Sequence, residues 1–236
     1  MRTILLKFSG PLQSWGTSSH FETRHTDLYP SKSAVIGMIA AAFGYRREET
    51  EKIKAFDSLL FGVRTDQFGN IRADFQNAHK LKKPELTVET NYVTKRYYLD
   101  DSVFLVAIGH ENSSFIDEIA SALKHPYFGL YMGRRSCPVP EDFVLNIADK
   151  GIVELLESYP WQAAKWYQRK NKQATLPIHL DSCLLPNKES TFRQDKIVSL
   201  SFQGREYELR KETSENKDIN DVGDSTEHDI FDALGD

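Results

Sequence analysis

Two runs of bulky apolar residues, at 2–8 and 102–109, end in small or polar residues, and such runs predict buried strands. Residues 34–43 are apolar on all sides and stop at Gly44, which predicts a buried helix closed by a glycine. At 113–124 apolar residues recur at helical spacing between polar ones, so an amphipathic helix is expected there. These four segments outline a core.

Weaker patterns predict the remaining elements. A helix is expected at 48–56, a strand and helix at 143–159, and further strands at 58–64, 127–132, 175–180, 196–202 and 205–209. Through residue 145 the order is strand, helix, strand, a polar excursion, strand, helix, strand. Ferredoxin-like and RNA-recognition-motif sheets have this split βαβ order. The sequence therefore predicts an α+β fold with a ferredoxin-like core within residues 1–145.

The excursion at 71–98 is polar, basic and aromatic, and it is expected to form a protruding hairpin. Residues 146–210 are expected to add a small C-terminal β-sheet region. The segment 211–236 holds nine acidic residues against two lysines and is predicted to be a disordered tail. Residues 1–210 then carry 28 basic and 25 acidic residues, a net charge of +3 against -4 for the whole chain. The folded body is mildly basic.

Two cysteines, Cys137 and Cys183, make neither a zinc-ligand signature nor a disulfide framework. No apolar stretch approaches the roughly 20 residues that span a bilayer, and the N-terminus does not resemble a signal peptide. We expect a cytoplasmic protein that has no membrane contact, metal or cofactor.

The loop after the first strand combines flexible backbone with hydrogen-bonding side chains. Gln13 and Ser14 offer donors and acceptors to bases or phosphates, and Trp15 offers a ring that stacks. Further on, Ser31, Lys32 and Ser33 stand at the N-terminus of the predicted helix 34–43, where free amides attract anions; the glycine-rich spacing of a Walker A loop is absent. The alternative is structural: Trp15 lies in the core, a serine caps the helix and Lys32 is solvated.

A second loop reads Gly133-Arg134-Arg135-Ser136-Cys137 and ends at a proline. Two adjacent guanidinium groups on a constrained turn suit phosphate binding. The alternative is an arginine pair bonded to nearby carboxylates. Cys137 has cationic neighbours that favour a thiolate, but a small buried residue is the more ordinary explanation.

Cations alternate with aromatic rings along the predicted hairpin, as in Lys95-Arg96-Tyr97-Tyr98. Single-stranded nucleic acid needs both, because cations bind phosphates and ring faces stack on bases. A solvated hairpin whose tyrosines pack on its own base is the alternative. The basic, aromatic stretch 161–172 either contacts nucleic acid or covers the C-terminal strands.

Metal-free RNA cleavage needs a general base, a general acid and a cation. The histidines are scattered, and only His20 and His25, on either side of Arg24, form a local cluster. No catalytic residue is assigned, so the sequence predicts nucleic-acid binding without chemistry. The residues predicted to bind are Gln13, Ser14, Trp15, Arg24, Ser31, Lys32, Ser33, Arg96, Tyr97, Gly133, Arg134, Arg135 and Ser136.

Three stretches carry a family resemblance: 10–16 (GPLQSWG), 30–33 (PSKS) followed by Gly37, and 131–138 (YMGRRSCP). In order and spacing, residues 2–143 resemble the CasD subunits of type I-E CRISPR Cascade complexes, within the repeat-associated RNA-binding superfamily. The resemblance implies a ferredoxin-like core with an inserted thumb at about 75–96 and a short C-terminal sheet.

The resemblance also implies a function, which is to hold the 5′ handle of the CRISPR RNA at one end of the complex. The implied partners are that RNA, the backbone subunit CasC, the large subunit CasA and, through the complex, target DNA. Another subunit cuts the precursor in this subtype. The alternative is a metal-independent endoribonuclease like the type I-C relatives, which cut with a tyrosine, a lysine and a histidine. Their tyrosine matches Phe43 here, and the absence of a hydroxyl at this position argues against cleavage. Tyr45 lies two residues further on.

Overall fold

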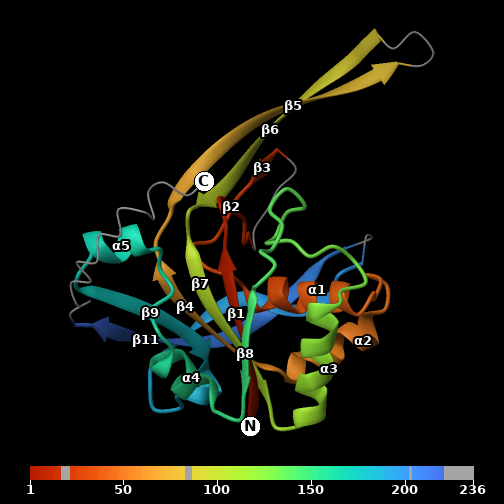
Figure 1. Cartoon of the computed structure of the whole chain (residues 1–236). Helices are drawn as coiled ribbons and strands as arrows, with labels where there is room; N and C mark the ends of the chain where they lie inside the picture. The colour runs from red at the N-terminus through yellow and green to blue at the C-terminus, as the bar shows by residue number, and fades with distance from the viewer. Residues whose placement is uncertain (17–21, 83–86, 202–203, 221–236) are drawn as a thin grey trace.

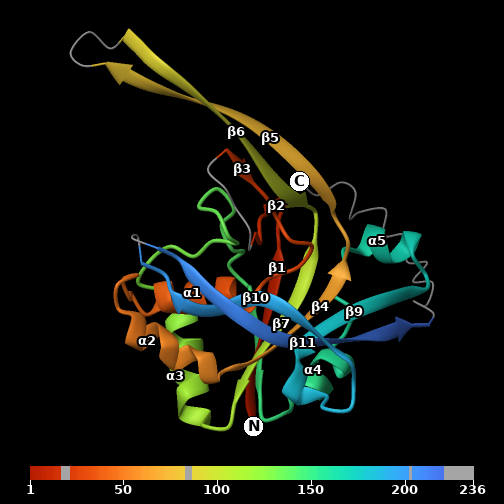
Figure 2. The same cartoon turned by 180° about the vertical axis from the view of Figure 1, so that it is seen from behind.

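A seven-stranded sheet forms the body of the molecule (Figures 1 and 2). The computed structural model describes residues 1–16, 22–82, 87–201 and 204–220, with only the backbone at 81, 82 and 87–89. The sheet has the order β10-β11-β9-β4-β7-β1-β8, and neighbouring strands pair antiparallel. Its strands are β1 (Arg2–Ser9), β4 (Leu60–Gln67), β7 (Val103–His110), β8 (Val144–Ala148), β9 (Ala174–Asp181), β10 (Ser190–Ser199) and β11 (Glu206–Ile219).

Helices cover both faces of the sheet. Successive side chains on a strand point to opposite sides, so one strand contributes to the core on each face. On β1, Ile4, Leu6 and Phe8 join the larger core cluster, which the residues of α1 and α3 complete. Leu5, between them, joins a second cluster with the residues of α4. The helices concerned are α1 (Lys32–Ala42), α3 (Ser113–Lys124) and α4 (Ile152–Ser158).

The remaining helices are short. They are α2 (Thr50–Lys54), η1 (Ala55–Ser58), α5 (Lys165–Lys170) and η2 (Ser182–Leu184). Among the described residues no helix has both the length and the apolar character needed to span a membrane.

A long hairpin of β5 (Asn70–Lys82) and β6 (Thr87–Asp100) projects from the sheet (Figure 1). Two short strands line its base. β2 (Leu12–Gln13) pairs antiparallel with the end of β6, and β3 (Thr23–Arg24) pairs parallel with Lys95 and Arg96. The long loop after β1 is thereby attached to the foot of the hairpin.

Two predictions about the C-terminal part are wrong. Because β9 pairs with β4, the last three strands extend the core sheet and do not form a sheet of their own. Residues 211–219, predicted as tail, form most of β11. Their acidic side chains meet donors, namely Arg210 for Glu212, Lys188 for Glu215 and Thr175 for Asp218. The predicted disorder of 221–236 lies outside the described residues.

The segment 127–132 is also not the predicted strand. Its only described pairing is an isolated bridge between Tyr131 and Pro138. Met132 N donates to Cys137 O at 2.7 Å, so the chain closes a tight turn at this point and does not continue along the sheet. This turn carries the second predicted loop.

Candidate nucleic-acid interface

The two predicted loops lie against each other. Ser14 N donates a hydrogen bond to Met132 O at 3.2 Å. Gly133 has a φ of +82°, and a Cβ built on it would lie 1.6 Å from Ser14 O. A residue with no side chain is therefore required at 133, both for the left-handed backbone and for the close approach of the two loops.

Several predicted contact residues of the first loop are part of the core instead. Gln13 is fully buried, and its Nε2 donates to Ser102 O at 2.7 Å while its Oε1 accepts from Trp15 Nε1 at 3.1 Å. Trp15 is 1 % exposed and stacks on Phe8. The predicted stacking of Trp15 on a base is wrong for this structure, since the ring is enclosed. Ser14 is also buried, with Oγ 3.3 Å from Tyr97 O.

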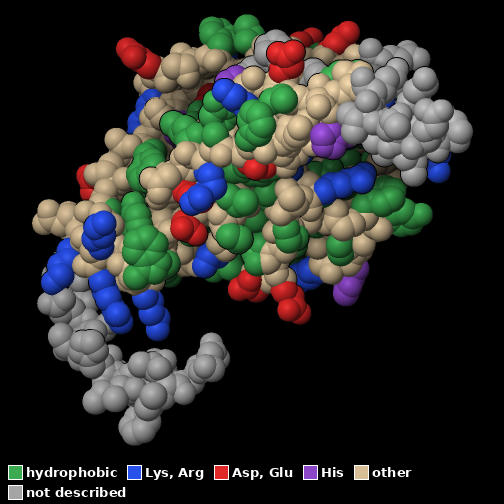
Figure 3. Space-filling model, turned by 90° about the horizontal axis from the view of Figure 1, so that it is seen from above, with side chains coloured by type: hydrophobic (Ala, Val, Ile, Leu, Met, Phe, Trp, Pro, Cys, Tyr) green, Lys and Arg blue, Asp and Glu red, His purple; other side chains and the backbone are tan. Residues whose placement is uncertain are grey.

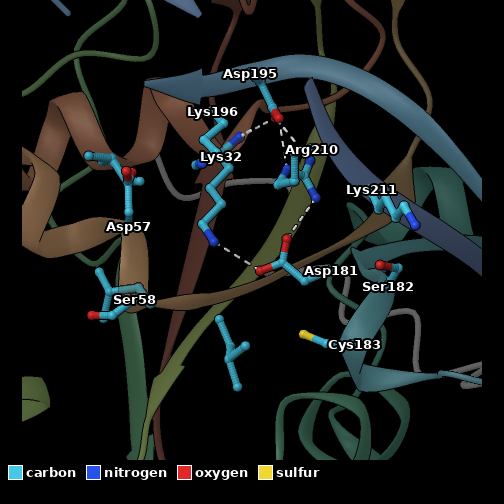
Figure 4. Close-up of a pocket in the computed structure, with 13 residues that line it drawn as sticks. Lys32, Asp57, Ser58, Asp181, Ser182, Cys183, Asp195, Lys196, Arg210 and Lys211 are labelled. Atoms are coloured by element: carbon cyan, nitrogen blue, oxygen red, sulfur yellow. Dashed lines mark hydrogen bonds and ion pairs between the residues drawn. The ribbon is translucent and has the colours of Figure 1, made fainter. Parts of the chain in front are cut away.

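The start of α1 is occupied by the protein's own carboxylates. The Ser31 hydroxyl caps the helix by accepting a hydrogen bond from Ala34 N, and the Ser33 hydroxyl lies 3.2 Å from the Ser31 hydroxyl. Lys32 N donates to Asp195, and Lys32 Nζ bonds Asp181 at 3.0 Å (Figure 4). Lys32 is thus neither solvated nor free to bind a phosphate, and the predicted anion site already holds an anion.

The pocket drawn in Figure 4, of about 260 Å³, belongs to this ion cluster. Arg210 bonds Asp195 at 2.7 Å and Asp181 at 2.8 Å. Burial alone would lower the pKa of Arg210, but the hydrogen bonds and charges of these carboxylates raise it overall, so it stays charged. The cluster joins the N-terminus of α1 to β9, β10 and β11, and we assign it a structural role.

The remaining predicted residues converge at the foot of the hairpin, on three segments that are distant in the sequence. Arg24 lies on β3, Arg96 and Tyr97 lie on β6, and Arg134 lies on the second loop. Arg134 Nη2 donates to Arg24 O at 3.0 Å, and its guanidinium lies 4.3 Å from the ring centre of Tyr98. Tyr98 was not among the predicted residues, although the run Lys-Arg-Tyr-Tyr that contains it was the relevant signal.

Two arginine nitrogens at this junction have no hydrogen-bond partner in the part of the chain that the structure describes. Arg96 Nε and Arg134 Nη1 are buried, and no described residue accepts a hydrogen bond from either. Buried N–H groups are nearly always bonded, so the two nitrogens mark a place for an acceptor. Within the described ranges, Arg24, Arg96, Arg134 and Arg135 are also absent from the ion pairs to carboxylates. No carboxylate in the described part of the chain thus supports the alternative of an arginine pair bonded to carboxylates.

Stacked rings lie beside these arginines. Tyr97 packs face to face on His25, with ring centroids 5.3 Å apart and planes 9° from parallel. Arg24, His25, Arg135 and Ser136 are exposed, whereas Arg96, Tyr97 and Arg134 are half-buried. The junction thus presents cations and aromatic faces together, the combination that single-stranded nucleic acid requires.

Cys137 and Tyr45, two groups considered for chemistry, pack against other side chains of the core. Cys137 is buried, and burial raises the pKa of its thiol, which disfavours a nucleophilic thiolate. Phe43 stacks on Tyr45 with ring centroids 5.4 Å apart, and both pack beside Phe56. His20, the neighbour proposed for His25, lies outside the described residues.

Comparison with known proteins gives a consistent answer. A family model described as "CRISPR-associated protein (Cas_Cas5)" matches residues 3–214. The chain is 29% identical over 161 residues to "CRISPR system Cascade subunit CasD" of Escherichia coli (strain K12), covering 61% of this chain and 70% of that protein.

Two solved structures are similar along almost the whole chain. A chain of a "CRISPR RNA-guided surveillance complex" is 31% identical with a TM-score of 0.74, covering 92% of this chain and 90% of that one. A second, titled "Crystal structure of Cas protein", is 29% identical with a TM-score of 0.65, covering 93% and 95%. Because the family model spans most of its length, the chain belongs to the Cas_Cas5 family of CRISPR-associated proteins.

Proposed function

We propose that this protein is a non-catalytic RNA-binding subunit of a Cascade-type CRISPR surveillance complex, and that it holds the 5′ handle of the CRISPR RNA. The names of its relatives, a Cascade subunit and a chain of an RNA-guided surveillance complex, support this assignment. In this role it caps the complex at one end, beside the backbone subunit CasC and the large subunit CasA, during recognition of target DNA.

The observation that carries the proposal is the pair of buried arginine nitrogens without an acceptor, Arg96 Nε and Arg134 Nη1. A phosphate oxygen satisfies such N–H groups and neutralises the guanidinium charge in the same contact. Arg24, on β3, and Arg135 and Ser136, next to Arg134 in the chain, add exposed donors. Tyr97 and His25 supply ring faces beside it.

The site residues proposed from the sequence then divide into two groups. Arg24, Arg96, Tyr97, Arg134, Arg135 and Ser136 contact RNA through their side chains. Gln13, Ser14, Trp15, Ser31, Lys32, Ser33 and Gly133 shape the loops, and any RNA contact that they make is through the backbone. Affinity arises from the phosphate contacts, and selectivity arises from the rings and from base-edge contacts on an extended strand.

The fold suits this function. Taken in chain order, β1, β4, β7 and β8 lie in the spatial order 4-1-3-2, with α1 and α3 on one face. We propose that this unit is a ferredoxin-like core and that the β5–β6 hairpin is its thumb, which extends along the guide toward the neighbouring backbone subunit. β2 and β3 anchor the RNA-binding loop to the foot of that thumb.

The proposal predicts that Arg134→Ala combined with Arg135→Ala weakens binding of the purified full chain to its repeat-derived 5′ handle. The loss should be about tenfold or more, since one charge-assisted hydrogen bond contributes about 1.5–3 kcal/mol. The slope of log K against log salt should fall by about 1.4, because each cation on a single strand contributes about 0.7. Fluorescence anisotropy across a salt series measures both.

A matched control removes two exposed cations elsewhere, Lys124→Ala with Arg205→Ala, and should leave handle binding nearly unchanged. A handle of scrambled sequence should bind the wild type more weakly. Equal behaviour of the two double variants would refute the assignment of the site. Cleavage of the RNA in EDTA by the wild type, lost on His25→Ala, would instead establish a metal-independent endoribonuclease.

A further inference from the structure

The short helix α5 presents a basic face with a tryptophan at its centre. Lys165, Trp166, Arg169 and Lys170 are all exposed, and Trp166 retains 58% of its accessible surface. Lys165 with Arg169, and Trp166 with Lys170, are four positions apart, so the members of each pair are neighbours on the helix surface. Figure 3 shows Lys and Arg side chains gathered at this edge of the molecule, over α5, around a large apolar side chain.

The helix is held rigidly on the end of β4. Gln162 N donates to Asp66 Oδ2 at 2.6 Å, and Ala164 N donates to Gln67 Oε1 at 3.0 Å. Trp161 Nε1 also donates to Asp66 O at 2.6 Å. Asp66 is itself fixed by a buried ion pair with Arg64. The exposed face of α5 is therefore preformed.

Among the described residues, the side chains of this face make few contacts with the rest of the fold. The ring contact of Trp166 among the described residues is an edge-to-face one with Tyr167, at 5.6 Å and 79°. No carboxylate in the described part of the chain forms an ion pair with Lys165, Arg169 or Lys170. An exposed tryptophan between cations without carboxylate partners marks a surface for a ligand that has both negative charge and flat rings.

This face is separate from the RNA-binding loops. Figures 1 and 2 both show α5 at the outer side of the molecule, at the foot of β5, whereas β2 and β3 lie further in beside β6. A ligand on α5 does not share a described side chain with the junction of Arg96 and Arg134. The two surfaces can be tested independently.

We propose that the α5 face is a second binding site, specific for single-stranded nucleic acid but not for its sequence. Lys165, Arg169 and Lys170 contact phosphates, and a base stacks on Trp166. DNA and RNA strands share this chemistry, so the test includes both. A folded acidic protein offers carboxylates at scattered positions, whereas in a single strand a charged phosphate and a flat base recur at every nucleotide, and for this reason we favour nucleic acid.

The test uses the full chain with the unstructured oligonucleotides dT20 and U20, which lack the handle. Trp15 is enclosed and Trp161 is half-buried, so we expect oligonucleotide binding to quench mainly the emission of Trp166. Trp166→Phe should abolish the quenching and retain most of the affinity, since phenylalanine also stacks. Trp166→Ala should weaken binding about 5- to 150-fold, as expected for loss of one stacked base worth about 1–3 kcal/mol.

Lys165→Ala with Arg169→Ala should lower the salt slope by about 1.4, whereas the matched Lys124→Ala with Arg205→Ala control should not. The Arg134→Ala, Arg135→Ala variant should keep the quenching, so failure of the proposed handle site leaves this result unaffected. Unchanged binding of both oligonucleotides by the α5 variants would overturn the proposal. If the same variants bind both oligonucleotides normally but fail to join the assembled complex, the proposal is also overturned, and α5 is assigned to a protein partner. A preference between dT20 and U20 identifies the natural strand as DNA or RNA.

Discussion

Gly133 joins the two loops proposed to bind RNA because it has no side chain. Its left-handed backbone brings Ser14 O to a distance that no Cβ tolerates, and Met132 O accepts from Ser14 N beside it. Arg134, the next residue, then has its guanidinium over Tyr98. The position of the cation thus depends on the absence of one carbon atom at the preceding residue.

At this scale we predict that Gly133→Ala destabilises the protein and weakens handle binding together. Backbone strain alone contributes about 1–3 kcal/mol, and the clash with Ser14 O pushes the loops apart. Gly129→Ala is the matched control, because nothing lies within 4 Å of a Cβ there and its φ is not positive. Urea unfolding and handle binding measure the two effects. A Gly133→Ala chain that binds like the Gly129→Ala chain would contradict the role of this contact.

The sequence could nominate residues able to bind RNA but could not say which of them the fold itself uses. Gln13 bonds a carbonyl 89 residues away, and Lys32 bonds a carboxylate 149 residues away. Neither partner is visible without the tertiary structure. All four of Trp15, Lys32, Arg96 and Arg134 have side chains able to bind RNA. Trp15 and Lys32 are buried in the fold, whereas Arg96 and Arg134 are only half-buried.

Among the elements, the end of β4 is where distant parts of the chain are fixed. Arg64 and Asp66 form a fully buried ion pair at 2.6 Å. The guanidinium also donates to the carbonyl oxygens of Tyr159 and Pro160, at 2.9 and 3.0 Å. One strand end thereby fixes the chain between α4 and α5 and supports the face of α5.

We predict that Asp66→Ala lowers the free energy of unfolding by about 3–5 kcal/mol, because it leaves the Arg64 charge buried without its partner. Asp149→Ala removes a carboxylate from an exposed pair with Arg2 and should change stability little. Chemical denaturation compares the two. Similar losses of unfolding free energy in both variants would show that the buried ion pair contributes no more to stability than the exposed one.

Most elements could be predicted, because long apolar runs such as β1, β7 and α1 leave little ambiguity. The strand ends and the C-terminal part could not. β11 is acidic and poor in apolar residues, and it is ordered by cations and by pairing with β9, which local sequence does not reveal. At 127–132 a tight turn replaced the strand, because hydrogen bonds across residues 132–137 outweighed local propensity.

In the molecule as a whole, the long loop after β1 and the C-terminal strands are joined through buried polar groups. Tyr29, which follows β3, donates to Glu212 on β11 at 2.7 Å and stacks on His179 of β9 with ring centroids 3.9 Å apart. Arg193 of β10 lies over the Tyr29 ring at 4.1 Å. The loop is thus held at the hairpin on one side and at the extended sheet on the other.

This junction predicts a pH dependence. The pKa of His179 is lowered, mainly by burial and also by the charges of Arg193 and Arg210. The charge of Glu212 raises this pKa but does not outweigh them. The unfolded chain takes up a proton near the ordinary histidine pKa of about 6.5, and the folded chain takes it up only at lower pH. Stability should therefore fall as pH decreases below about 6.5.

We expect His179→Gln to show a smaller loss of unfolding free energy between pH 7.5 and 5.5 than the wild type. The exposed His125→Gln should keep the wild-type dependence. Unfolding curves at the two pH values measure the difference. If all three proteins respond to pH alike, His179 is not the titrating group.

The position of β11 has a consequence for the order in which the molecule forms. It lies between β10 and β9, although it is the last described strand to be synthesised. Until it emerges, β9 has an open edge, Asp181 and Asp195 lack Arg210, and Tyr29 lacks a partner 183 residues away. Contacts of such separation form slowly, because the chain between them must first be closed into a loop. We therefore expect the long loop near the N-terminus to reach its final structure late, when β11 enters the sheet.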